Sequence, residues 1–282
     1  MTLEITPSGQ ACGAEIRGVD LSAPLPAEIV AGIRAAWLEH QVLSFPDQSM
    51  SDEDLERFTL YFGPFGEDPF IASIPGHQHI IAVQRAADET APIFAESWHT
   101  DWSFQAAPPS GTCLFGITIP PRGGDTLFAN QYLALEQMPT ELRERLDCKK
   151  AIHSAKNAYA PDGMYGEADK ASGRSMTIIA STEAQASQIH DIIREHPETG
   201  RESVFGTAGY ITGFEGMAPD EGWELLAELY RWQTRPEFQY RHVWQENMLV
   251  MWDNRYCLHR GRPWDFGEYK RIMHRTTLNG SY

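Results

Sequence analysis

Cysteines and basic residues are scarce in this sequence. Its 282 residues include four widely spaced cysteines, Cys12, Cys113, Cys148 and Cys257, with none of the CxxC pairs of zinc or thioredoxin-like sites. Lys and Arg number 23 against 39 Asp and Glu, which gives a formal net charge of −16. Such a charge repels nucleic-acid phosphates and anionic membrane surfaces. We therefore expect reduced thiols and no nucleic-acid or membrane partner.

Long apolar runs are also missing. No stretch reaches roughly 18 uninterrupted apolar residues, and positions 1–18 contain no apolar core of a signal peptide. We therefore expect a soluble, cytoplasmic protein. Hydrophobic residues nevertheless make up 42% of the chain and aromatic residues 11%, which suffices for a substantial core. We expect a single domain over residues 1–282.

Four segments have the caps and the periodicity of helices. Ser51 begins one of them with an acidic residue three positions later, as in a capping box. The other three are Pro26–His40, Pro139–Leu146 and Pro219–Trp232. In the last of these, Trp223, Leu226, Leu229 and Tyr230 recur at helical spacing and are expected to form its apolar face.

Short runs rich in Val, Ile, Phe and Thr indicate strands. These runs are Gln41–Phe45, His79–Val83, Thr112–Ile119, Ser175–Ile179 and Met248–Trp252. They do not alternate regularly with helices as βαβ units would. The sequence therefore favours a mainly β fold with flanking helices, in the form of an antiparallel barrel or jelly roll.

The segment Asn157–Arg174 is rich in Gly, Pro and Asp and weakly periodic. A loop of this length in a compact domain is usually functional or disordered. We expect a long loop or an active-site lid here.

The tripeptide His99-Thr100-Asp101 is the sharpest chemical signal. In an extended strand, residues i and i+2 project to the same side, which would bring the imidazole and the carboxylate together. These two groups form two thirds of the 2-His-1-carboxylate triad of non-haem Fe(II) oxygenases. A third ligand is then required.

The second signal lies near the C-terminus. His259 follows a strand and could supply the third ligand, and Arg271 and Arg275 lie four residues apart shortly after it. Guanidinium groups grip carboxylates bidentately. Two of them near a candidate metal ligand would suit an anionic dicarboxylate in a net-negative protein.

Together these residues resemble the Fe(II)/2-oxoglutarate-dependent dioxygenases of the taurine dioxygenase and 2,4-dichlorophenoxyacetate dioxygenase family. The resemblance spans nearly the whole chain. Supporting motifs follow in the family's order: GAEIRGVDL at Gly13–Leu21, FPDQ at Phe45–Gln48, YFGPFG at Tyr61–Gly66, GGDTLFAN at Gly123–Asn130, HPETGR at His196–Arg201 and WDNRYCLHR at Trp252–Arg260.

This resemblance implies a double-stranded β-helix, a jelly roll of the clavaminate synthase-like type, with Fe(II) held by His99, Asp101 and His259. It implies 2-oxoglutarate and O₂ as cosubstrates. By similarity, Thr126 and Arg271 would bind the distal carboxylate of 2-oxoglutarate. Arg275 would lie between the cosubstrate and the substrate.

The resemblance also implies the reaction. A small anionic or zwitterionic substrate, such as a sulfonate, sulfate ester, aryloxyalkanoate or amino-acid derivative, would be hydroxylated with release of succinate and CO₂. Two other readings use the same residues: a catalytically silent jelly-roll protein that binds metal and 2-oxoglutarate, and a cupin-like metal hydrolase. A homodimer or homotetramer is compatible with the sequence.

The chain departs from the taurine pattern at two positions. Asp68 stands where taurine enzymes of the family carry a histidine that contacts the sulfonate, and Ala95 replaces an amide-bearing residue. Like charges about 4 Å apart repel by about 4 kcal/mol at an effective dielectric of 20, which argues against taurine as the substrate. Asp68, Trp102, Phe104 and Arg275 are the candidate substrate-contacting residues.

Overall fold

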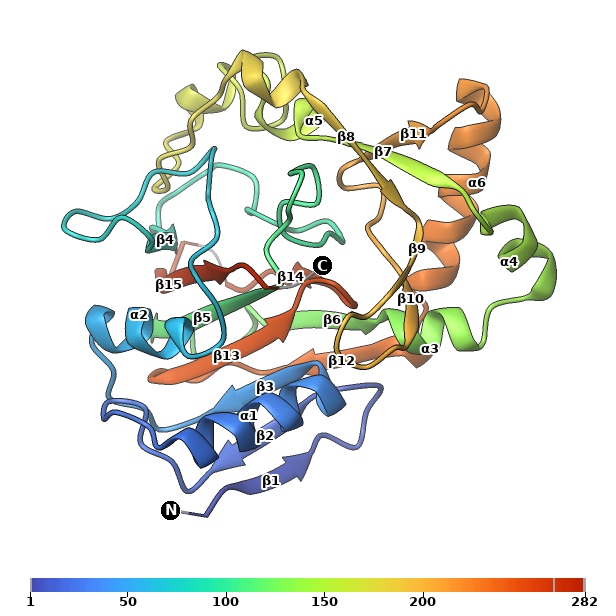
Figure 1. Cartoon of the computed structure of the whole chain (residues 1–282). Helices are drawn as coiled ribbons and strands as arrows, with labels where there is room; N and C mark the ends of the chain where they lie inside the picture. Colours follow the sequence, from blue (N-terminus) through green and yellow to red (C-terminus); the bar gives the residue numbers. More distant parts are fainter. Residues whose placement is uncertain (1, 266, 281–282) are drawn as a thin grey trace.

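The largest element of the computed structural model is a seven-stranded sheet (Figure 1). The structure describes residues 2–265 and 267–280. Within this sheet β2 and β3 pair in parallel, and the other neighbours are antiparallel. In spatial order the strands are β1 (Glu4–Pro7), β2 (Ala14–Arg17), β3 (Val42–Phe45), β13 (Met248–Asp253), β5 (Gly111–Thr118), β15 (Arg271–Leu278) and β4 (Ile81–Arg85).

The remaining strands form three smaller antiparallel sheets. Their spatial orders are β12 (Gln239–His242), β6 (Thr126–Asn130) and β14 (Cys257–Gly261); β11 (Ile211–Phe214), β7 (Lys150–Ser154) and β8 (Ser187–Asp191); and β10 (Glu202–Val204) with β9 (Ile193–Glu195). The expectation of a mainly β chain with flanking helices is thus confirmed. Four of the five predicted strand segments overlap β3, β4, β5 and β13.

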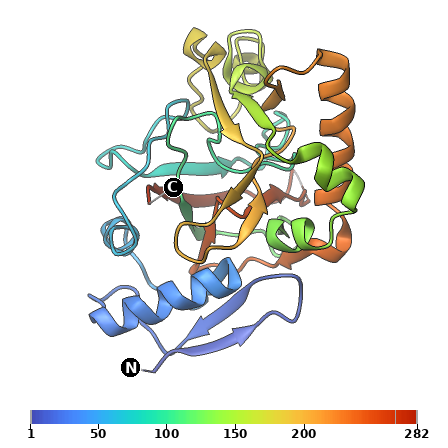
Figure 2. The same cartoon turned by 45° about the vertical axis from the view of Figure 1, so that its right-hand side comes forward.

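The helices flank these sheets. Their bounds are α1 (Ala27–His40), α2 (Asp52–Leu60), α3 (Gln131–Glu136), α4 (Thr140–Leu146), α5 (Lys156–Tyr159) and α6 (Pro219–Gln233), with short 3₁₀ turns at Asp169–Ser172, Thr182–Gln185 and Pro236–Phe238. All four predicted helices are present, and Ser51 and Asp54 form the expected capping box of α2. Figures 1 and 2 place α6 on one flank, beside β7 and β11. No helix among the described residues is long and apolar enough to span a membrane.

One sequence prediction about these elements is wrong, and a second, the apolar face of α6, holds for Leu226 and Leu229 but not for Trp223. The run Ser175–Ile179 forms no strand; its one ladder contact is an isolated bridge between Ile178 and Ile71. The backbone N–H of Ser175 is bonded to a side chain instead of to a neighbouring strand: it donates to the carboxylate of Glu89 at 2.8 Å. In α6, Trp223 is 48% exposed, because the helix packs its other face, Gly222, Leu225, Leu226, Leu229 and Gln233, inward.

The segment 157–174 contains the end of α5 and one 3₁₀ turn, and otherwise runs as loop. Buried Glu89 fixes its C-terminal end. The Glu89 carboxylate accepts hydrogen bonds from both the N–H and the hydroxyl of Ser175, at 2.8 and 2.6 Å. It also lies 3.2 Å from Arg85 Nη1 and 3.9 Å from Arg174 Nη1. A buried charge cluster therefore ties the segment to β4.

Candidate metal centre and active site

The backbones of His99 and His259 are hydrogen-bonded directly to each other. The His99 N–H donates to the His259 carbonyl at 3.0 Å, and the His259 N–H donates to the His99 carbonyl at 2.8 Å. His259 lies on β14, whereas His99 makes only this isolated bridge. Asp101 begins a turn in which Trp102 has a φ of +49°. The prediction that His99 and Asp101 share one extended strand is therefore wrong, although their side chains do meet.

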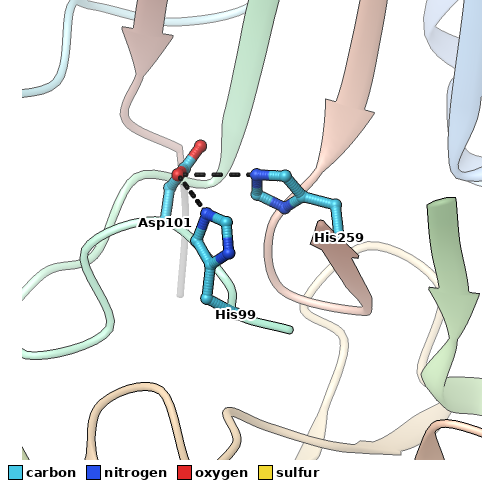
Figure 3. A group of neighbouring side chains, drawn as sticks. All are labelled: His99, Asp101 and His259. Carbon is cyan, nitrogen blue, oxygen red and sulfur yellow. Dashed lines mark ion pairs between the residues drawn. The ribbon is translucent and has the colours of Figure 1, made fainter. Parts of the chain in front are cut away.

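The side chains of His99, Asp101 and His259 converge on one point (Figure 3). Nε2 of His99 and Nε2 of His259 each lie 3.7 Å from Oδ1 of Asp101. One donor atom from each of the three residues lies within 4.8 Å of the other two. Since 3.7 Å is shorter than twice a metal–ligand bond of about 2.1 Å, one ion can contact Asp101 together with either histidine.

The protonation of the three groups suits a cation. Burial lowers the pKa of His99, and burial together with neighbouring His99 lowers the pKa of His259 to about 3, so both imidazoles are neutral at pH 7. Burial alone would raise the pKa of Asp101, but His259 and Arg275 hold it below its ordinary value. Two neutral imidazoles and one carboxylate are the donor set of the non-haem Fe(II) triad.

Hydrogen bonds to neighbouring residues orient two of these three side chains, Asp101 and His99. The Thr112 hydroxyl donates to Oδ2 of Asp101 at 2.7 Å, which leaves Oδ1 for an ion. Nδ1 of His99 lies 2.9 Å from the Ser97 carbonyl, so this nitrogen carries the proton and Nε2 presents its lone pair. Such outer partners fix the tautomer and the ring orientation of a ligating histidine. The residues present therefore fit a bound divalent metal.

The triad opens onto a cavity of about 330 Å³. The cavity is lined mainly by aromatic side chains, which come from segments far apart in sequence: Phe94, Trp98, Trp102, Tyr159, Tyr165, Tyr210 and Tyr230. The segment 157–174 contributes two of these together with Met164. Such a cavity suits a small organic molecule held against the metal.

The predicted substrate residues have different positions around this cavity. Trp102 and Arg275 line it. Phe104 packs instead against Phe70 and Tyr210, with ring centroids 5.6 and 5.0 Å away, and is a core aromatic. Asp68 is not a lining residue, because its carboxylate forms a buried ion pair with Arg275.

Arg271 and Thr126 both contact Trp244. The Trp244 indole donates to the Thr126 hydroxyl at 2.9 Å, and the guanidinium carbon of Arg271 lies 5.8 Å from the Trp244 ring centroid. Among the described residues, no carboxylate lies within ion-pair distance of Arg271, and its buried Nε has no hydrogen-bond partner. Burial lowers the pKa of Arg271 to about 10, so it remains cationic at neutral pH.

Arg271 also lines a small cavity of about 30 Å³ next to the main one. Phe94 lines both cavities. Asp125 acts on the Arg271 charge only from beyond ion-pair distance, and its carboxylate is paired with Arg241. A buried cation without a contacting counter-ion is expected to have a ligand anion. Arg271 is therefore a candidate for binding a carboxylate in the small cavity, which shares Phe94 with the main one.

No sequence motif predicts a role for His242, Tyr159 or Tyr210. His242 lies opposite Thr126 in the β12–β6 ladder, and its buried Nε2 has no partner among the described residues. Tyr159 and Tyr210 line the cavity. Each comes from a different element, so no local motif marks them; only the strand register and the path of the loops bring them to the site.

Comparisons with known proteins agree with this geometry. A family model described as "Taurine catabolism dioxygenase TauD, TfdA family" matches residues 4–277. An alkylsulfatase of Acinetobacter baylyi is 33% identical over 95% of this chain and 82% of its own length. An alpha-ketoglutarate-dependent sulfate ester dioxygenase of Pseudomonas putida is 32% identical over 99% of this chain and 90% of its own. The crystal structure of a putative alpha-ketoglutarate-dependent taurine dioxygenase from Burkholderia xenovorans superposes with a TM-score of 0.82 at 31% identity, covering 99% of this chain and 93% of that one.

Proposed function

The chain belongs to the TauD, TfdA family of alpha-ketoglutarate-dependent dioxygenases, and we propose that His99, Asp101 and His259 hold its Fe(II). The convergence of three metal-ligating side chains on one buried point carries this proposal. With only three protein ligands, the bound ion would keep coordination positions free for cosubstrates. When bound, Fe(II) supplies the redox chemistry that couples oxidative decarboxylation of 2-oxoglutarate to hydroxylation of the substrate.

Arg271 and Thr126 orient 2-oxoglutarate in this proposal. The guanidinium takes the distal carboxylate through two parallel N–H bonds, and the Thr126 hydroxyl adds a third contact. Two observations support this role: among the described residues no carboxylate lies within ion-pair distance of Arg271, and the small cavity that it lines shares Phe94 with the main cavity. The Arg271 guanidinium would hold the distal end of 2-oxoglutarate in one position, so that the keto acid end would point toward His99 and His259.

The double-stranded β-helix belongs to the same proposal. Antiparallel strands from distant parts of the chain, such as β5, β13 and β15, lie next to one another, as in a jelly roll. The histidine of β14 and the arginines of β15 would then face one interior. The likeness to the Burkholderia xenovorans structure supports this topology.

The substrate in this proposal is a small anionic or zwitterionic molecule with an apolar body. The aromatic lining of the cavity supports the apolar body, and Arg275 supports an acidic group near the metal. The names of the relatives, a sulfate ester dioxygenase and an alkylsulfatase, are consistent with acidic substrates. The lining residues of the segment 157–174 would cover the bound molecule as a lid.

The test is succinate formation by the purified chain in air with Fe(II), ascorbate and 2-oxoglutarate. The panel contains alkylsulfonates, sulfate esters, aryloxyacetates and amino acids, and His99→Ala is the blank. We expect succinate that increases with one class of substrate and is lost in the variant. Product formation that does not require 2-oxoglutarate would contradict the proposal.

A further inference from the structure

Arg275 is the single lysine or arginine among the described residues that line the main cavity. A substrate acid that enters this cavity therefore has one cationic side chain to bind. The Arg275 side chain is 5% exposed, so an anion that reaches it leaves most of its water behind.

This cation already has an anionic partner within the protein. Nη2 of Arg275 forms an ion pair with Oδ1 of Asp68, and the Trp102 indole donates to the same oxygen at 2.7 Å. The Arg275 guanidinium carbon also lies 5.1 Å from the Trp102 ring centroid. Asp68, Arg275 and Trp102 thus form a closed cluster in which each member contacts the other two.

A second carboxylate lies on the other side of the guanidinium. Nη1 of Arg275 is 3.6 Å from Oδ1 of Asp101. A bound metal neutralises Asp101, but Asp68 has no second cation among the described residues. A substrate carboxylate or sulfate at Arg275 would therefore approach a like charge, and like charges in contact repel strongly in a partly buried site.

We propose that Asp68 is a specificity-determining residue, an internal counter-ion that withholds Arg275 from plain anions and so favours zwitterions that place their cationic group beside Asp68 and their acid at Arg275. A zwitterion adds no net charge to the neutral Asp68–Arg275 pair, and its cationic group offsets the repulsion that its acid meets. This inference rests on the proposed function, because it concerns the substrate of that same site.

The experiment compares two probes that differ by one ammonium group, phenylacetate and 2-phenylglycine. Isothermal titration calorimetry measures their Kd for the full chain loaded with Fe(II) and 2-oxoglutarate under argon, where no turnover occurs. In Asp68→Asn the amide still accepts the Trp102 hydrogen bond but carries no charge. We expect the Kd of phenylacetate to fall roughly tenfold, equivalent to about 1.4 kcal/mol, while 2-phenylglycine gains no affinity.

A matched control separates this effect from a general change of charge. Glu67 adjoins Asp68 and is exposed, and no ion pair of its carboxylate is recorded among the described residues. Glu67→Gln removes the same charge and should leave both Kd values unchanged. Asp68→Glu keeps the negative charge that Asp68→Asn removes, so it should keep the preference for the zwitterion. A purely structural role of Asp68 does not predict this result.

An Asp68→Asn variant that does not gain affinity for phenylacetate overturns the inference, even if neither probe binds measurably, because a released guanidinium must attract an anion. A melting curve of each variant confirms that it is folded, and Asp68→Ser replaces Asp68→Asn if the latter is not. The proposed function fails by a different result, the absence of substrate-dependent succinate in air. The two failures are therefore distinguishable.

Discussion

Replacing Arg271 with methionine should change stability and cosubstrate binding in opposite directions. Arg271 is a buried cation without a protein carboxylate in ion-pair distance among the described residues. Its charge therefore destabilises the folded chain until an anion binds. Methionine fills a similar volume without that charge.

The size of the stability change follows from the lowered pKa of Arg271. Burial lowers the pKa of Arg271 from 12.5 to about 10, and one pKa unit corresponds to about 1.4 kcal/mol, so the buried charge costs about 3 kcal/mol. This cost is fully present below pH 10 and decreases as the pH rises toward the unfolded value. Loss of the contacts with Trp244 and Trp264 offsets about 1 kcal/mol of the gain. We expect a Tm increase of roughly 2–6 °C without ligand.

Arg271→Met should also weaken the binding of 2-oxoglutarate. Two charge-assisted hydrogen bonds to the distal carboxylate contribute about 3 kcal/mol, so the Kd should rise roughly a hundredfold. Scanning calorimetry with and without 2-oxoglutarate measures both effects, since a ligand at 100 times its Kd stabilises the folded state by about 2.7 kcal/mol. Wild-type chain should melt higher with 2-oxoglutarate, whereas Arg271→Met should not.

Arg85 provides the matched control, because it lines the same small cavity but is bonded to Glu89 and to the Ala91 carbonyl. Arg85→Met should lower the Tm, because it leaves Glu89 with one cation fewer. If Arg271→Met lowers the Tm as well, or binds 2-oxoglutarate as tightly as wild type, the account of Arg271 as an anion receptor is refuted.

Three further predictions concern the surroundings of the site. Thr112→Val removes the hydrogen bond to Asp101 and should weaken metal binding roughly tenfold in a metal titration of the apo chain; unchanged affinity would show that Thr112 does not orient the ligand. Burial lowers the pKa of His153 to about 3, below the unfolded value of 6.5. Stability should therefore fall as the pH drops from 6.5 toward 3, by about 2 kcal/mol at pH 5, and His153→Asn should flatten this slope in melting curves. Glu89→Gln weakens the anchor of the segment 157–174 and should raise the KM for the substrate while leaving the Kd for 2-oxoglutarate unchanged; an equal rise in both would contradict the assignment of Glu89 to the segment.

Local signals in the sequence were sufficient for the helices and for most long strands. The capping box at Ser51 and the spacing of Ile29, Ile33 and Trp37 predict α2 and α1 because caps and helical periodicity depend on near neighbours. The run Ser175–Ile179 has the composition of a strand, but Glu89, 86 residues away in sequence, accepts the N–H of Ser175. No local pattern contains that contact.

The candidate site shows the same division. The sequence motifs predict that His99, Asp101 and His259 meet. His99 and Asp101 do not share an extended strand, however, since Asp101 lies in a turn and Trp102 has a positive φ. The ion pair between Asp68 and Arg275 joins residues 207 positions apart. Residue types and motifs can predict a metal triad, whereas the partner of each charge depends on the folded chain.

The reciprocal hydrogen bonds between the backbones of His99 and His259 have a further consequence. These two bonds hold the ligand backbones together without any contribution from an ion, in contrast to small zinc domains that fold only when metal binds. We therefore expect a bound metal to add to the stability of a fold that is already hydrogen-bonded at this point, rather than to create that fold. On the proposed metal role, removing the metal with a chelator should lower the Tm and abolish activity while the chain stays folded, and adding the metal back should restore both.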